Sequence, residues 1–128
     1  MKSTQNPQLE GMAILLPVSD MSAAQDFYQN VLKFELRTRS DDGTYVLLAR
    51  DNAAVGLLQG SEEFNHDRSA YVWVDDVDAL FDELKPGLES LPEGDLRPPF
   101  RQPYGMREFH VKDPSGVLWF FGQAAELA

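Results

Sequence analysis

The chain has 128 residues, of which 43% are hydrophobic and 25% are charged, as expected for one ordinary globular domain. Asp and Glu number 21 against 11 Lys and Arg, so the formal net charge is −10 at pH 7. This excess argues against nucleic acid and anionic membrane surfaces as partners. It is compatible with the capture of a cation, or with solubility alone, because the acidic residues are spread along the chain. Cysteine is absent, which excludes disulfides and thiolate chemistry.

The N-terminal residues, Met1–Glu10, form a polar leader without the apolar core of a signal peptide. The first apolar run, Met12–Leu16, is followed by Pro17 and is too short to span a membrane. We therefore expect a cytoplasmic protein with no membrane partner.

The first half of the chain predicts a strand, a helix and three further strands. Gly11–Val18 has the pattern of a strand, and Ser19-Asp20 supplies a helix N-cap. The apolar residues that follow at helical spacing are Met21, Ala24, Phe27, Tyr28, Val31 and Leu32. The three strands expected next are Phe34–Thr38, Thr44–Ala49 and Ala53–Gln59, the first two joined by a turn at Ser40–Gly43.

The second half repeats this order after a polar linker, Gly60–Arg68. A shift of 56 residues places Val18-Ser19-Asp20 on Val74-Asp75-Asp76. Ser69–Asp75 is then a strand, and Asp76 caps a helix with Val77, Leu80, Phe81 and Leu84 on one face. A repeat of this kind indicates one supersecondary unit that has been duplicated.

The second half ends in a predicted hairpin. Two apolar-rich runs, Met106–Val111 and Val117–Phe121, flank the turn sequence Asp113-Pro114-Ser115-Gly116. If Asp113 faces Gly116, then Val111 opposes Leu118 and Phe109 opposes Phe120. Since strand side chains alternate, His110 and Trp119 would share the other face.

Between the second helix and this hairpin lies a proline-rich stretch, Lys85–Arg101. Prolines are poor residues for central strands, so a strand around Leu88–Leu91 or Asp95–Arg97 is expected to be short or at an edge.

Two stretches, Ala70–Asp75 and Gln102–Phe121, resemble the bleomycin-resistance branch of the glyoxalase, or vicinal-oxygen-chelate, superfamily. The resemblance implies an α+β fold in one domain, residues 1–128, with paired βαβββ modules at about 11–59 and 69–123. The modules would form a curved, cup-like mixed sheet with helices on its convex side. It also implies a homodimer whose cups are completed across the interface.

The superfamily's enzymes hold a divalent metal in the cup with His and Glu side chains. The positions that match those ligands here are Ala13, Gly56, Ser69 and Phe120, and these residues do not provide a metal site. Glu108 and His110 could supply two ligands, but two ligands do not make a site. The hairpin pairing above also turns both side chains toward the helices or a sheet edge. We therefore expect no metal and no cofactor.

An aromatic lining remains in the cup. The resemblance places Tyr45, Tyr71 and Tyr104 around the ligand, with Trp73 deeper, although each of these rings could instead belong to the core. The loop and strand beside Tyr104 add Gly105, Arg107 and Glu108, and the last two could either fix a ligand or pair with each other. The predicted function is non-catalytic sequestration of a small, cationic, partly aromatic molecule, as in bleomycin-type antibiotic resistance.

Two alternatives remain open. One is a metal-dependent enzyme of the same superfamily, a lyase, isomerase or dioxygenase, with displaced ligands. The other is a protein that shares the fold and binds an unrelated metabolite. The sequence has no phosphate-binding glycine loop and no nucleophile elbow, which favours a binding protein over an enzyme, and we assign no catalytic residue.

Overall fold

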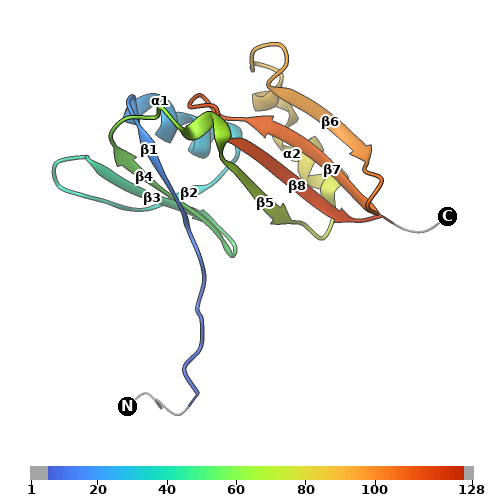
Figure 1. Ribbon diagram of the computed structural model, residues 1–128, viewed down its shortest axis with the longest axis horizontal. Helices are drawn as coiled ribbons and strands as arrows, with labels where there is room; N and C mark the ends of the chain where they lie inside the picture. The colour runs from blue at the N-terminus through green and yellow to red at the C-terminus, as the bar shows by residue number, and fades with distance from the viewer. Residues whose placement is uncertain (1–5, 126–128) are drawn as a thin grey trace.

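The computed structural model of the protein describes residues 6–125, which form two βαβββ modules (Figure 1). The first module consists of β1 (Ile14–Val18), α1 (Met21–Asp26) with the π-helical turn η1 (Phe27–Val31), β2 (Glu35–Arg39), β3 (Tyr45–Arg50) and β4 (Ala53–Gln59). After the short helix η2 (Asn65–Asp67), the second consists of β5 (Ser69–Trp73), α2 (Val77–Leu88), β6 (Leu96–Arg101), β7 (Met106–Lys112) and β8 (Leu118–Ala124).

Each module contributes one four-stranded mixed sheet. The strand orders are β1-β4-β3-β2 and β5-β8-β7-β6, so the two sheets have the same topology. The pairs β1–β4 and β5–β8 are parallel, and all other pairs are antiparallel. The predicted α+β class and the duplicated unit are confirmed.

One face of each sheet packs on the helices, and the alternation of side chains explains which residues lie there. In the first sheet the buried residues are Leu16, Val18, Val46, Leu48, Val55 and Leu57. In the second they are Phe109, Val111, Trp119 and Phe121. Residues of the opposite parity lie on the other side of each sheet, which we call its open face.

The two modules share one core through η1. Tyr28 Oη donates to Asp113 Oδ2 at 2.5 Å, and Trp119 Nε1 donates to Tyr28 Oη at 2.9 Å. Burial, together with the charge of Asp113 and the hydrogen bond to it, raises the pKa of Tyr28. α2 passes close to η1 at Gly87, where a Cβ atom would lie 3.2 Å from Val31 Cα. The first helix therefore docks onto the second module as well as its own sheet.

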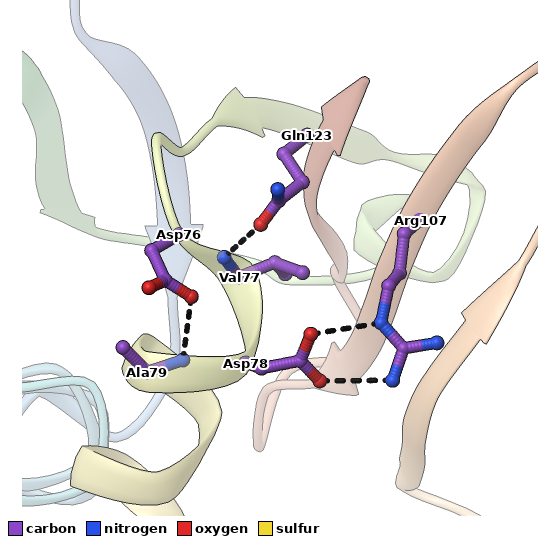
Figure 2. A network of polar contacts seen from close by, with 6 residues as sticks. All are labelled: Asp76, Val77, Asp78, Ala79, Arg107 and Gln123. Carbon is purple, nitrogen blue, oxygen red and sulfur yellow. Dashed lines mark hydrogen bonds and ion pairs between the residues drawn. The ribbon is translucent and has the colours of Figure 1, made fainter. Parts of the chain in front are cut away.

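Both predicted helix N-caps are confirmed. Asp20 accepts from the Ala23 amide and Asp76 from the Ala79 amide, each at 3.0 Å, and Figure 2 shows the second of these caps. The lengths of the helices were less predictable. The first changes to a π-helical turn after Asp26, and the second extends to Leu88 with Pro86 inside its last turn.

The predicted pairing of the β7–β8 hairpin is wrong by one residue. Val111 pairs with Trp119, Phe109 with Phe121 and His110 with Phe120. The turn is longer than expected because the Asp113 amide bonds the Val117 carbonyl at 2.9 Å, while the Asp113 carboxylate accepts from the amides of Ser115 and Val117. A slip of one residue moves every side chain of one strand to the other face.

The proline-rich stretch holds the edge strand β6, so its expected edge position is confirmed. Its pairing with β7 is irregular between Arg97 and Phe100, where Pro98 and Pro99 lie, because proline has no amide hydrogen to donate to the ladder. The alternative of a strand at Leu88–Leu91 is wrong, since Leu88 ends α2.

Residues 6–13, before β1, run away from both sheets as an extended, exposed segment (Figure 1). Of the polar leader expected at residues 1–10, the structure describes residues 6–10, and the others lie outside the described part. No helix within residues 6–125 is long and apolar enough to cross a membrane.

The substitution Tyr28→Phe tests the link between the modules. We expect it to lower the free energy of unfolding by about 1–3 kcal/mol, because Asp113 and the Trp119 indole each lose a partner while buried. Urea denaturation measures this. Tyr45→Phe, which removes a hydroxyl that forms no hydrogen bond within the described residues, should stay within about 0.5 kcal/mol of the native protein. Equal effects of the two substitutions would contradict this role for Tyr28.

Candidate functional site

A continuous row of rings crosses the open face of the second sheet from β5 to β6. The row, which we call the aromatic row, consists of Trp73, Tyr71, Phe120, His110 and Phe100. Neighbouring ring centroids lie 4.1 to 6.0 Å apart, so each ring contacts the next. At the β6 end, the guanidinium carbon of Arg97 lies 3.5 Å from the centre of the Phe100 ring. The row provides a surface made largely of ring atoms.

A buried carboxylate, Glu108 on β7, lies beside this row. Its side chain has no exposed surface, and four side chains direct donors at it. Tyr71 Oη donates to Oε2 at 2.7 Å, while Oε1 accepts from Tyr104 Oη at 2.7 Å and Gln102 Nε2 at 2.8 Å. His110 Nε2 lies 2.7 Å from Oε1. We call these five residues the Glu108 network.

The network keeps Glu108 ionised. Burial alone would raise the pKa of the carboxyl, but the hydrogen bonds from His110, Tyr104, Tyr71 and Gln102 together lower it to about 2. The tyrosines shift the other way. Desolvation and the hydrogen bond to Glu108 raise the pKa of Tyr71, and the same causes raise the pKa of Tyr104 to about 12. At neutral pH both hydroxyls therefore keep their hydrogens, and Glu108 carries none.

Gly122 makes the contact between Tyr71 and Glu108 possible. Gly122 pairs with Glu108 across β7 and β8, and the Tyr71 ring passes over it. A Cβ atom at position 122 would lie 2.1 Å from Tyr71 Oη and 2.9 Å from its Cζ, which is too close for the ring to stay in place. Our sequence analysis missed Gly122, although a glycine inside a strand is a signal of close approach.

The structure brings three of the predicted ligand-binding residues together, namely Tyr71, Tyr104 and Glu108. Gly105, with φ of +86°, closes the tight loop that presents Tyr104, since its amide bonds the Gln102 carbonyl at 3.1 Å. The sequence analysis did not include Gln102 in the site. It assigned Glu108 and His110 to the helix side or a sheet edge, which is wrong because the one-residue slip reverses their face.

Trp73 and Arg107 lie differently from expectation. Trp73 contacts Tyr71 but is 76% exposed, so it lies at the end of the row and not deeper in it. Arg107 points to α2, where its Nε and Nη2 donate to the two oxygens of Asp78 at 2.9 and 2.8 Å (Figure 2). The alternative in which Arg107 pairs with Glu108 is therefore wrong.

Tyr45 belongs to the open face of the other sheet. It lies over Gly56, where a Cβ atom would be 3.3 Å from Tyr45 Cε1, and the half-exposed Leu15 lies beside it. Among the ring contacts of residues 6–125, none joins Tyr45 to Tyr71 or Tyr104. The Tyr45 ring thus lies on a different sheet from the aromatic row.

Of the four positions expected to match the superfamily's metal ligands, Gly56, Ser69 and Phe120 lie on β4, β5 and β8, and Ala13 directly precedes β1. Leu15 pairs with Gly56, and Ser69 with Leu118, while Phe120 belongs to the aromatic row. Within the described part of the chain, no three His, Asp or Glu side chains are grouped to hold a metal ion. Glu108 and His110 do meet, but the oxygens of Glu108 are occupied by donors. These residues do not fit the metal centre of the superfamily's enzymes.

A cleft of about 1100 Å³ separates the two modules along β1 and β5. Both strands are at the edge of their sheets, so their outer backbone groups have no strand partner within residues 6–125. The walls are largely apolar, with Leu32, Phe34, Leu84 and Trp119 among them, and Trp73 also contributes.

Comparison with known proteins gives a consistent result. The family model for the glyoxalase/bleomycin resistance protein/dioxygenase superfamily matches residues 12–121. Among curated proteins, none matches this chain. The bleomycin-binding protein of Streptomyces verticillus, solved with copper(II)-bleomycin, is 26% identical, with a TM-score of 0.75 over 94% of this chain and 100% of that one.

Two further solved structures have the same fold. The antibiotic-binding protein TnmS3 from a Streptomyces species is 21% identical, with a TM-score of 0.70 over 96% of this chain and 100% of that one. A lactoylglutathione lyase from Agrobacterium tumefaciens is 21% identical, with a TM-score of 0.66 over 91% and 95%.

The fold and the site thus define a protein built from paired βαβββ modules with an aromatic open face. The chain belongs to the glyoxalase/bleomycin resistance protein/dioxygenase superfamily.

The lowered pKa of Glu108 predicts an acid-dependent loss of stability. The ionised carboxylate contributes roughly 3 kcal/mol of stability at pH values above its ordinary pKa of 4.5, and this is lost as the pH falls toward about 2. Glu108→Gln cannot titrate, so its free energy of unfolding should fall less than that of the native protein over this range. Urea denaturation at several pH values measures the difference. Glu93→Gln, at an exposed position, should keep the native acid dependence, and identical slopes for all three proteins would contradict the prediction.

Proposed function

We propose that the protein binds and sequesters a small, cationic, partly aromatic molecule of the bleomycin type without making or breaking a bond in it. The observation that carries this proposal is the aromatic row with the ionised Glu108 beside it. Ring faces attract flat aromatic groups and cations, and a nearby negative charge strengthens the attraction for a cation. The net charge of −10 speeds the arrival of such a ligand.

The comparisons support a binding role. The similar proteins include one solved with copper(II)-bleomycin and one described as antibiotic-binding. A lyase of the same fold is also similar, but the side chains at the metal-ligand positions here do not supply the donors that such a metal needs. Sequestration therefore accounts for the site better than metal-dependent catalysis does.

We further propose that two copies of the chain complete each binding cup. The open face of the first sheet carries Tyr45 beside the exposed Leu15 and Leu58, and that of the second carries the exposed Trp73 and Tyr104. Monomers rarely leave such apolar surfaces in water, and a two-fold dimer is the commonest way to cover them. In this arrangement the ligand lies between Tyr45 of one copy and Tyr71 and Tyr104 of the other.

Calorimetry with bleomycin tests the proposed function. We expect saturable binding, weakened in Tyr104→Ala by about 0.5–1.5 kcal/mol beyond the lost contact area if the ring stacks on the drug. Phe64→Ala, which removes another exposed ring on the linker, should bind as the native protein does. Absence of heat with bleomycin would remove the support for this drug class. Tyr104→Ala also removes a donor to the buried Glu108, so the stability control is Tyr104→Phe, which loses the same donor but keeps the ring. A melting temperature of Tyr104→Ala far below that of Tyr104→Phe would instead assign the ring to the core.

Light scattering tests the proposed assembly. At micromolar concentration the native protein should have twice the mass of one chain, and Leu15→Glu should shift it toward the monomer, because a charge would be buried at the interface. Phe64→Glu, an equal change at an exposed ring away from the open faces, should remain dimeric. A native protein with the mass of one chain would reject the dimer.

A further inference from the structure

The Glu108 network fixes the direction of its hydrogen bonds. An ionised carboxylate has no hydrogen to donate, so every partner of Glu108 must be the donor. A tyrosine hydroxyl has one hydrogen. At Tyr71 and Tyr104 that hydrogen is directed to Glu108, in contacts of 2.7 Å each. Each hydroxyl oxygen can then take part in a further hydrogen bond only as an acceptor.

The other two members of the network, Gln102 and His110, are also hydrogen-bond donors to Glu108. Gln102 Nε2 donates to Glu108 at 2.8 Å, and His110 Nε2 must carry its hydrogen because it faces the same carboxylate at 2.7 Å. The His110 ring lies between Phe100 and Phe120, so the network's polar groups at the open face are the two tyrosine hydroxyls and the partly exposed side-chain amide of Gln102. Tyr104 is 60% exposed and Tyr71 is partly exposed, so both can meet a ligand.

The negative charge of the network also favours a cationic ligand. Among the residues that the structure describes, the basic side chain that pairs with Glu108 is a histidine, and the carboxylate has no Lys or Arg partner. The negative charge therefore lies within hydrogen-bond distance of both tyrosine hydroxyls and beside a row of ring faces. Arg97 already covers the Phe100 end of the row, so the part of the surface that attracts cations and repels anions is the part around Tyr71 and Tyr104.

From this geometry, and resting on the proposed function, we infer that Glu108 is a specificity-determining residue that acts through Tyr71 and Tyr104. It makes both hydroxyls obligate acceptors, and the site thereby selects aromatic ligands that carry an ammonium, guanidinium or amide N–H group. Glu108 itself does not touch the ligand. A cage of rings alone would bind any cation, whereas this site distinguishes an ammonium group with N–H bonds from one that is fully methylated.

Three matched probes separate these properties, namely naphthylmethylammonium, its trimethylammonium analogue and naphthoate. The first is a cation with N–H donors, the second a cation without them, and the third an anion. We expect calorimetry with the native protein to show that the first binds about tenfold more tightly than the second, as a charged hydrogen bond to an acceptor implies. Naphthoate should bind most weakly.

Variants assign this preference to the network. Glu108→Gln can both accept and donate, so it frees a tyrosine hydrogen to turn outward. The ratio of the affinities for naphthylmethylammonium and its trimethylammonium analogue should then fall toward one. The affinity for naphthoate should rise. Glu93→Gln makes the same change in net charge at an exposed position and should keep the native preference. The double substitution Tyr71→Phe and Tyr104→Phe keeps both rings and should reduce binding of naphthylmethylammonium alone by about tenfold.

A further variant tests the network without changing any polar group. Gly122→Ala places a Cβ atom where the Tyr71 hydroxyl lies, so it should reduce the preference for N–H donors while the ring surface still binds the trimethylated probe. Gly60→Ala, where the nearest atom is 3.7 Å from the added Cβ, is the matched control and should behave as the native protein does.

The outcomes are distinct. Equal affinity of the native protein for the two cations, or a preference unchanged in both Glu108→Gln and the double tyrosine variant, would overturn the inference and leave sequestration standing. If bleomycin binds while the two cationic probes bind with equal affinity, the inference is likewise overturned and the proposed sequestration stands. Failure of all three probes and of bleomycin to bind would overturn the proposed function together with the inference.

Discussion

The site depends on one constraint, which is the burial of an ionised carboxylate. A charged Glu108 without partners would cost several kcal/mol in the interior of the protein, so its four donors are a requirement of folding and not an addition to it. These donors come from β5, from the loop before β7 and from β7 itself. The carboxylate therefore ties β5, 37 residues away in the sequence, to β7 and the loop before it, and it holds Tyr71 and Tyr104 in place before any ligand arrives.

The backbone around Glu108 is adapted to this arrangement. Gly122 leaves room for the Tyr71 ring to cross β8, and the left-handed conformation of Gly105 turns Tyr104 back over the strand. On the opposite side of the same strand, Arg107 pairs with Asp78 at the start of α2 (Figure 2). Arg107 thus anchors α2, and the next residue of β7, Glu108, organises the open face.

Local signals explain what could be predicted from the sequence. The repeat at 56 residues and the caps at Asp20 and Asp76 depend on short-range patterns, and both modules and both caps are present as expected. The position of Glu108 depended on the hairpin register. That register is set by side-chain hydrogen bonds of Asp113 to the amides of Ser115 and Val117, which the turn sequence alone did not disclose. The ion pair of Arg107 joins residues 29 positions apart, and no local pattern indicates it.

The same strands can serve catalysis or binding, and the difference lies in how carboxylate lone pairs are used. A carboxylate that ligates a metal must direct unshared electron pairs at the ion. At the positions expected to correspond this chain has Ala13, Gly56, Ser69 and Phe120, and the carboxylate beside its aromatic row, Glu108, lies on β7 instead. There both of its oxygens accept hydrogen bonds from protein donors, and in the role that we propose its charge acts on a ligand through the tyrosine hydroxyls. A negative charge screened from direct contact in this way can orient and attract a cation without the chemistry of a metal centre.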